Sequence, residues 1–207
     1  MLHFTTVHHD TLALLKTLQT IPELGQTRLV GGTALALHLG HRMSIDLDVF
    51  GDIDGGPRSL QIAFTKQNLS FVTTHTSANI YQYLIRAVQV DIVNYPYHWL
   101  VDPIVCDGIT LAGLQDIAAM KLSAITNRGT KKDFVDFFFL LNIFSLDEML
   151  AFYEDKYSSG SIFNVVQSLS YFDDAEAEPL PKMLKPFDWT QTKNTIVQTV
   201  QQFSKKK

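Results

Sequence analysis

Apolar residues at helical and at alternating spacing define the first elements of the chain. Residues 10–19, DTLALLKTLQ, place three leucines on one face of a predicted helix, which Pro22 ends. The run RLVGG predicts a short strand that enters a glycine turn. Residues 33–39 then predict a short helix that stops at Gly40.

The segment SIDLDVF, residues 44–50, alternates with the period of two that is typical of a strand. One face of this strand would carry Ile45, Leu47 and Val49. The other face would carry Ser44, Asp46, Asp48 and Phe50. The glycine-rich run GDIDGGPRS predicts a loop after it, and residues 60–68 predict a weak helix.

A second strand-forming region, NIYQYLIRAVQVDIVNYPY, is rich in β-branched and aromatic residues. It predicts two antiparallel strands that turn near residues 86–87. In the second of these strands Val90 and Ile92 share one face, and Asp91 points to the other.

From about residue 111 the apolar spacing becomes helical. Gly129 is expected to stop a first helix, Thr130 to open a second, and Ser145 with Glu148 to form the capping box of a third. The apolar positions of the first, second and last helices are Leu114, Ile117, Leu122 and Ile125, then Phe134, Phe137, Phe138 and Leu141, then Ile196, Val200 and Phe203. The chain therefore predicts an α+β (mixed α/β) fold, in which a small, mostly antiparallel sheet precedes a helical portion.

Composition narrows the class of protein. Hydrophobic residues make up 46% of the chain and charged residues 18%, which is typical of a globular protein. The net charge of −4 gives no overall basic footprint for nucleic acid. The single cysteine, Cys106, excludes an intramolecular disulfide and fits a reducing compartment. Since no segment has the length and apolarity of a signal peptide or membrane span, we expect a cytoplasmic protein without membrane contact.

Two aspartates in an apolar strand are the strongest chemical signal. Residues two apart on a strand return to the same face after roughly 6.6 Å, so Asp46 and Asp48 would present their carboxylates side by side. Asp91 on a neighbouring strand could add a third carboxylate. Such a cluster repels itself unless a cation neutralises it, and Mg²⁺ (or Mn²⁺) prefers hard oxygen ligands. Two ions would clamp the attacking and leaving oxygens of an in-line displacement.

The glycine turn supplies a second signal. Gly31 and Gly32 let a ligand approach the backbone, the N–H groups that open the next helix favour phosphate, and Thr33 adds a hydroxyl. A lone Gly-Gly pair is usually an ordinary turn, and a lone Asp-x-Asp is usually a solvated strand face. Together, one short helix apart, they favour a nucleoside triphosphate (NTP) held at both ends.

The block GGTALALHLGHRMSIDLDVF resembles the signature of bacterial AbiEii/AbiGii-type toxins, which are nucleotidyltransferases of the DNA polymerase β-like superfamily. The resemblance implies a nucleotidyltransferase core over residues 1–110 and a helical domain over residues 111–207. It implies that the glycine turn binds nucleotide phosphate and that the Asp-x-Asp pair binds magnesium. Arg42 and Ser44, in the same block, are further candidates for nucleotide binding.

Downstream segments continue the resemblance. QVDIVNY resembles the strand that carries the third acidic residue, which makes Asp91 the candidate. DIAAMKLSAITNRGTKKDFVDFFFLL resembles the family's helical motif, in which a lysine and a later acidic residue are functional; Lys121 and Asp133 fit these positions.

Each of these helical residues also has a purely structural interpretation. Lys121 could be a solvated lysine, Asp133 could belong to a T-x-x-D cap with Thr130, and Asp136 could be an i,i+4 partner of Lys132.

Structural roles are predicted for most of the remaining polar and aromatic residues. Arg128 and Lys131, beside the helix junction, could contact nucleic acid or nucleotide, but surface charges are the favoured interpretation. His41 with Arg42 is expected to shape the rim of the site or approach phosphates. The Phe134–Phe139 cluster is expected to be core packing. The histidines lack a recognisable zinc spacing.

The leading hypothesis is therefore a Mg²⁺-dependent nucleotidyltransferase that moves a nucleoside monophosphate from an NTP to an acceptor hydroxyl. The resemblance implies an RNA acceptor such as a tRNA 3′ end, an AbiEi-like antitoxin as partner, and a role in abortive infection by phage. Two alternatives remain. One is a haloacid-dehalogenase-like phosphatase, suggested by DLDVF, and the other is a catalytically inactive nucleotidyltransferase fold that binds a partner.

Overall fold

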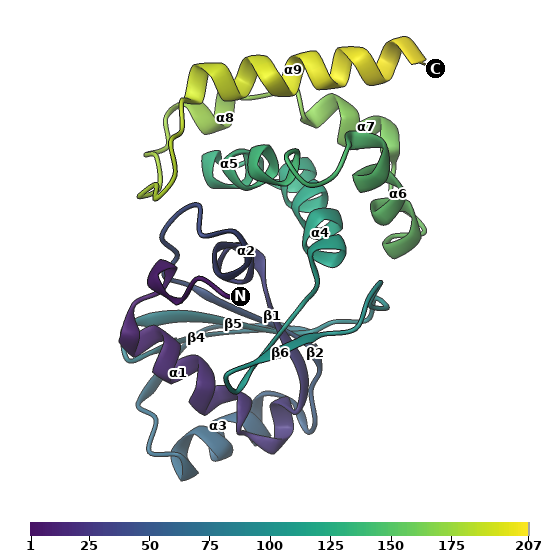
Figure 1. The fold of residues 1–207 in the computed structure, drawn as a ribbon. Coiled ribbons are helices and arrows are strands. Elements are labelled where there is room, and N and C mark those ends of the chain that lie inside the picture. Colours follow the sequence, from purple (N-terminus) through teal and green to yellow (C-terminus); the bar gives the residue numbers. More distant parts are fainter. Residues whose placement is uncertain (207) are drawn as a thin grey trace.

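The computed structural model describes residues 1–206, in which a single mixed β-sheet lies between two groups of helices (Figure 1). Among these residues seven strands pair in the order β3-β4-β5-β2-β1-β7-β6. Their bounds are β1 Gln26–Val30, β2 Leu47–Asp52, β3 Phe71–Thr76, β4 Ile80–Ile85, β5 Val88–Asn94, β6 Ile104–Cys106 and β7 Ile109–Leu111. Only the β2–β5 and β1–β7 pairs are parallel within this described sheet. The predicted mixed, mostly antiparallel sheet is confirmed, although it is larger than expected.

Helices cover both faces of the sheet. On one side lie α1 (His9–Gln19) and α3 (Gly56–Lys66), and on the other lie α2 (Gly31–Leu39) and the helical portion (Figure 1). The helical portion consists of α4 Leu114–Asn127, α5 Lys131–Leu140, α6 Leu146–Lys156, α7 Ile162–Ser168, α8 Asp173–Glu176 and α9 Trp189–Lys206. Two 3₁₀ turns, η1 (Phe4–Thr6) and η2 (Pro22–Leu24), flank α1.

Several local signals act as the sequence predicts. Gly40 ends α2 in the left-handed conformation, with φ of +65°. Arg86 and Ala87, with φ of +50° and +61°, form the tight turn of the β4–β5 hairpin. Ser145 and Glu148 form both hydrogen bonds of the capping box that opens α6.

The strand that carries the acidic pair begins later than predicted. It starts at Leu47, and Ile45 is 60% exposed instead of buried beside Leu47 and Val49. The preceding residues form a loop because other segments take their backbone groups. The Ser44 N–H donates to the carbonyl oxygen of Thr6 at 2.9 Å. Local alternation could not reveal these distant partners.

Other differences are smaller. Helix α3 begins at Gly56 inside the predicted loop, where Pro57 occupies the first turn that favours proline. Strands β3, β6 and β7 and the short helices α7 and α8 were not predicted. The cluster interpretation of the phenylalanines is confirmed, since Phe134 and Phe137 are fully buried. Among the described residues, the helices are too short or too polar to cross a membrane.

Candidate active site

The glycine turn lies at the end of β1, where α2 begins. Gly31 has a φ of +66°, and a methyl group there would overlap the carboxylate of Asp48. A methyl group at Gly32 would overlap the guanidinium of Arg42. Both glycines are therefore required so that these charged side chains can approach the start of the helix.

Thr33 and Ser44 are buried and fix the loop that leads to Asp46. The Thr33 hydroxyl lies 2.8 Å from Ser44 Oγ and donates to the carbonyl oxygen of Asp46. Thr33 is only 1% exposed and Ser44 8% exposed. In this structure both hydroxyls position the backbone of Asp46.

The carboxylates of Asp48 and Asp91 face the same side of the sheet. These residues are register partners on the parallel strands β2 and β5. The Asp91 carboxylate accepts hydrogen bonds from Gln82 Nε2 at 2.8 Å and Gln89 Nε2 at 2.9 Å. The predicted neighbourhood of the second and third acidic residues is therefore present.

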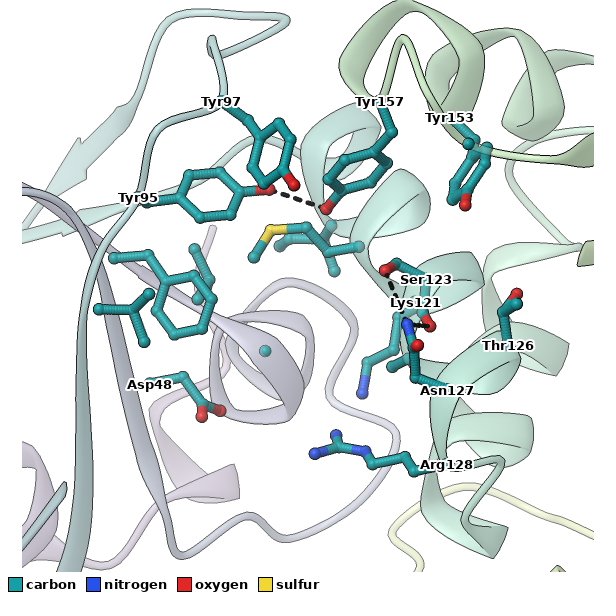
Figure 2. A pocket seen from close by; sticks show the side chains of 18 of the residues that line it. Asp48, Tyr95, Tyr97, Lys121, Ser123, Thr126, Asn127, Arg128, Tyr153 and Tyr157 are labelled. Atoms are coloured by element: carbon teal, nitrogen blue, oxygen red, sulfur yellow. Dashed lines mark hydrogen bonds between the residues drawn. The ribbon is translucent and has the colours of Figure 1, made fainter. Parts of the chain in front are cut away.

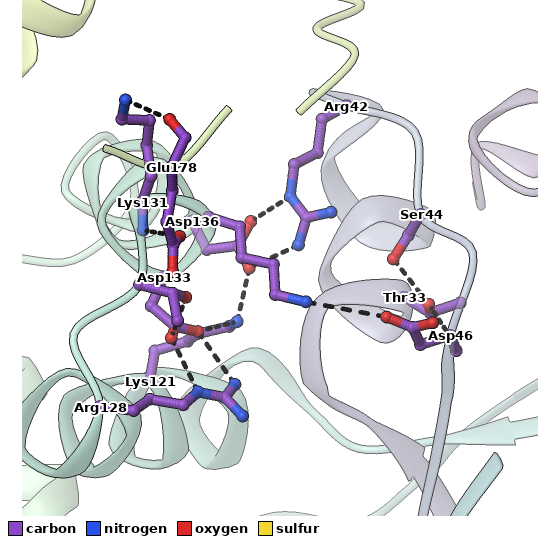
Figure 3. A network of polar contacts seen from close by, with 12 residues as sticks. Thr33, Arg42, Ser44, Asp46, Lys121, Arg128, Lys131, Asp133, Asp136 and Glu178 are labelled. Carbon is purple, nitrogen blue, oxygen red and sulfur yellow. Dashed lines mark hydrogen bonds and ion pairs between the residues drawn. The ribbon is translucent and has the colours of Figure 1, made fainter. Parts of the chain in front are cut away.

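Asp46 occupies a different setting, because it lies before β2 instead of within it. Its Oδ2 is 3.7 Å from Lys132 Nζ of α5, and Figure 3 shows the ion pair that reaches Asp46. All three carboxylates nevertheless line one pocket.

Burial, followed by the neighbouring charge of Asp91, raises the pKa of the Asp48 carboxyl from 3.8 to about 6. Lys121 and Arg128 oppose this rise without cancelling it. A nearby cation would therefore stabilise the ionised form of Asp48.

The donor chemistry of the three aspartates fits a divalent cation, since carboxylate oxygens are the ligands that Mg²⁺ and Mn²⁺ prefer. The Asp48 carboxylate packs so closely against Gly31 that a side chain there would overlap it, and its pKa is raised. Asp48 is therefore a confined carboxylate on the wall of the pocket. Within residues 1–206, however, no group of three or more His, Cys, Asp or Glu side chains is already arranged to hold a metal ion. The three aspartates therefore have the right chemical type of ligand atom for the metal, but in this structure their carboxylates are not yet gathered around one point.

Lys121 of α4 approaches the site from the helical portion (Figure 3). It is only 4% exposed, so the interpretation as a solvated lysine is wrong. Its Nζ lies 3.0 Å from Asp133 Oδ1 and 2.6 Å from Asp136 Oδ2. Burial lowers the pKa of Lys121, but the two aspartates outweigh this effect and raise it above its ordinary value. The lysine is therefore a fixed positive charge.

Asp133 is fully buried and accepts hydrogen bonds from several donors. Besides Lys121, Arg128 Nε donates to it at 3.0 Å and the Thr130 hydroxyl at 2.6 Å. Burial alone would raise the pKa of Asp133, but Lys121 and Arg128 hold it well below its ordinary value. Thr130 is the N-cap of α5, but its side chain bonds the Asp133 carboxylate instead of capping the backbone. The cap interpretation of Asp133 is therefore wrong in its detail.

Asp136 joins the glycine-turn block to the helical portion. Arg42 donates from Nε at 2.7 Å and from Nη2 at 2.8 Å, a bidentate pair (Figure 3). His41 Nε2 lies 2.8 Å from the same carboxylate. The predicted Lys132 partner is wrong, because Lys132 pairs with Asp46 instead.

Two expectations for neighbouring residues are wrong, and a third residue has a further role. His41 is fully buried, so it does not form the rim of the site. Lys131 is 8% exposed and its Nζ donates to the carbonyl oxygens of Glu176 and Glu178, so it is not a surface charge. The Arg128 side chain is 59% exposed, but it lines the site and bonds Asp133.

Two adjoining cavities share a wall that contains Asp48, Asp91, Lys121 and Arg128. We call the smaller one, about 420 Å³, the basic pocket, since its cationic lining is Arg42, Lys121, Arg128, Lys132 and Lys182. Gly32, Ser44 and Asp46 line it too.

We call the larger cavity, about 670 Å³, the tyrosine pocket after Tyr95, Tyr97, Tyr153 and Tyr157 (Figure 2). The first two tyrosines follow β5 and the other two end α6. The hydroxyls of Tyr95 and Tyr157 are 2.7 Å apart. These four tyrosines were not predicted as site residues from the sequence. The aromatic run YPYHW was their one visible signal, and strand propensity alone explained it.

A family profile described as "Nucleotidyl transferase AbiEii toxin, Type IV TA system" matches residues 13–205. The chain belongs to this AbiEii family. It is therefore a nucleotidyltransferase, and the expected resemblance is confirmed. It is 36% identical over 155 residues to the uncharacterized protein aq_aa25 of Aquifex aeolicus (strain VF5), covering 72% of this chain and 75% of that protein.

Two solved structures show the fold of this AbiEii protein. JHP933 from Helicobacter pylori has a TM-score of 0.60 at 20% identity, covering 97% of this chain and 94% of that one. MenT4, a nucleotidyltransferase toxin from Mycobacterium tuberculosis H37Rv, has a TM-score of 0.55 at 14% identity, covering 93% and 84%. The polymerase β-like fold is thus confirmed. The dehalogenase-like alternative is not supported, because β2 runs antiparallel to β1 instead of opening a parallel α/β sheet.

Proposed function

We propose that this AbiEii protein transfers a nucleoside monophosphate from an NTP to a hydroxyl group of an RNA acceptor, with Mg²⁺ as cofactor. The observation that carries the proposal is the meeting of the basic pocket and the tyrosine pocket at Asp48 and Asp91. A highly anionic triphosphate matches the basic pocket, and an aromatic base matches the tyrosine pocket.

The residues of the chain then take distinct roles. Lys121 and Arg128, on the shared wall, would bind the phosphates and stabilise charge that develops on them. Asp91 would accept the proton of the acceptor hydroxyl as its oxygen forms a bond to the α-phosphorus. The bond from that phosphorus to the bridging oxygen breaks, and pyrophosphate leaves.

Asp46, Asp48 and Asp91 would hold the metal. When bound, Mg²⁺ supplies a Lewis acid that neutralises the phosphate oxygens. Gly31 and Gly32 let the side chains of Asp48 and Arg42 approach the start of α2, and Thr33 with Ser44 fixes the backbone at Asp46.

The two portions of the chain also have distinct roles in this proposal. We propose that residues 1–110 form the catalytic core and that residues 111–207 form the helical domain, with Lys121 and Asp133 contributed by the second part. The tRNA 3′ end as acceptor and an AbiEi-like antitoxin as partner rest on the family, which is described as a type IV toxin–antitoxin system.

The function is tested by incubating the protein with each labelled NTP, Mg²⁺ and total RNA. We expect one or more NTPs to label RNA, and Asp46→Asn to lower the initial rate on the order of 10²-fold or more, because a metal ligand is lost. Asp52→Asn is the matched control, since Asp52 is an exposed aspartate at the far end of β2. Equal labelling by wild type and Asp46→Asn would reject the proposal. Binding of NTP without any transfer would favour the inactive, partner-binding alternative.

The tyrosine pocket yields a separate prediction. Tyr97 is 44% exposed, and its ring centroid lies 4.8 Å from that of Tyr157. We expect Tyr97→Ala to raise KM for the NTP about 5- to 150-fold, because stacking on an aromatic ring contributes about 1–3 kcal/mol per base. The kcat should change much less. Tyr97→Phe retains the ring and should remain close to wild type; an unchanged KM in Tyr97→Ala would show that the base binds elsewhere.

A further inference from the structure

The five cations of the basic pocket differ in how firmly they are held. Arg42 and Lys121 both bond the buried carboxylate of Asp136, and Arg128 bonds that of Asp133. Two carboxylates of α5 therefore hold all three of these cations in place and balance two of their three positive charges. The remaining two, Lys132 and Lys182, have no such buried partner among residues 1–206.

Lys132 is the cation of this pocket that forms an ion pair with one of the three acidic residues. Its one carboxylate partner in the described chain is Asp46, at 3.7 Å. The Lys132 side chain is 48% exposed and that of Asp46 is 43% exposed. An ion pair in this setting is weak, because water and salt screen it, and both side chains can exchange partners at little cost.

Asp46 is set apart from the other two carboxylates by its position and by its ion pair. Asp48 and Asp91 are register partners on adjacent strands, whereas Asp46 lies on the loop before β2 and is engaged by the ammonium group. A cation that used all three carboxylates would compete with Lys132 for the negative charge of Asp46 and would favour release of the ammonium group. Lys132 would then be left in the basic pocket without a carboxylate and beside the bound triphosphate.

We propose that Lys132 changes partner during substrate binding. In the free protein its ammonium group neutralises Asp46, and with metal and NTP bound it contacts a phosphate of the NTP. Lys132 thereby competes with the metal in the absence of nucleotide and supports the triphosphate in its presence. This inference rests on the proposed function and adds to it a substrate-binding residue that also controls entry of the metal.

The proposal predicts two changes of opposite sign in Lys132→Met. Binding of Mn²⁺ alone, measured by electron paramagnetic resonance, should become about 2- to 5-fold tighter because the competing ammonium group is gone. Binding of inorganic tripolyphosphate with Mg²⁺, measured by calorimetry, should become about tenfold weaker or more because a charge-assisted contact is lost. Tripolyphosphate makes the second measurement independent of which base the enzyme uses.

Two further variants make the result specific. Lys132→Arg keeps the charge and should stay near wild type in both assays. Lys182→Met removes a cation from the same pocket that does not pair with Asp46, so it should leave Mn²⁺ affinity within about twofold of wild type. Melting temperatures close to wild type would show that these exposed substitutions leave the fold intact.

Shifts of the same sign, unchanged Mn²⁺ affinity in Lys132→Met, or no Mn²⁺ binding by any variant would overturn the inference. Failure of the proposed function has a different signature, namely transfer that does not depend on Asp46. Transfer that depends on Asp46 while Lys132→Met shows no opposite shifts would reject the partner exchange alone.

Discussion

Replacing Asp136 with alanine is expected to destabilise the protein by about 3–5 kcal/mol, because it takes the carboxylate partner from buried Arg42 and one of two carboxylate partners from buried Lys121. Arg42 and Lys121 would lose this carboxylate at 4% exposure each, and fully buried His41 would lose its hydrogen-bond partner. Urea unfolding at pH 7 measures the loss. Asp52→Ala, on an exposed residue, should change the free energy of unfolding by less than about 0.5 kcal/mol.

The pH dependence of this effect has a definite sign. Burial alone would raise the pKa of Asp136, but Lys121 and Arg42 hold it well below the ordinary value of 3.8. A lowered pKa contributes stability above the unfolded-state value, and that stability is lost as the pH falls toward the folded-state value. The difference between wild type and Asp136→Ala should therefore be complete at pH 7 and shrink below about pH 4. A loss of less than about 1 kcal/mol at pH 7 would show that the network contributes little to folding.

The Asp136 network also explains why the two portions of the chain act on one site. Arg42 and His41 follow α2, Lys121 belongs to α4, and Asp136 belongs to α5. Their contacts bring the glycine-turn block against the helical portion. Lys121 is thereby fixed on the wall shared by the two pockets.

Much of the fold could be predicted because its signals are local. The helix at residues 9–19, the β4–β5 hairpin and the capping box of α6 each depend on neighbouring residues alone. Strands β6 and β7 have three residues each, and β7 joins the sheet by pairing with β1, about 80 positions earlier. Such long-range pairing leaves no periodic pattern in a three-residue segment.

The sequence predicted which residues form the candidate site better than it predicted which ion pairs they make. The glycines and the three aspartates were recognised from spacing and resemblance, and all three aspartates line the basic pocket. The partners of charged residues could not be predicted, because they come from distant segments. Lys132 pairs with Asp46 instead of with Asp136 on its own helix. A helical repeat indicates which residues share a face, but not which distant charge faces them.

Asp48→Asn is expected to lower the activity and to raise the stability of the protein. Metal binding needs the ionised carboxylate, whereas burial makes that ionised form unfavourable in the folded protein. Nucleotidyl transfer should fall on the order of 10³-fold, because the amide is a poor ligand for the metal and does not neutralise its charge. The free energy of unfolding should instead rise at pH 7. Burial and Asp91 raise the pKa of Asp48 from 3.8 to about 6, so ionisation of this residue costs the folded state free energy.

The sign of the stability change follows from linkage. A raised folded-state pKa contributes stability below about pH 4 that is lost as the pH rises through about 6. The asparagine variant does not incur that loss, so its advantage should be small at pH 4 and about 1–3 kcal/mol at pH 7. Urea unfolding in EDTA at both pH values measures it, with Asp52→Asn as the exposed control. If the free energy of unfolding differs between variant and wild type by the same amount at pH 4 and pH 7, ionised Asp48 is already well solvated or paired. Its ionisation would then not cost the folded state free energy that a bound cation could recover.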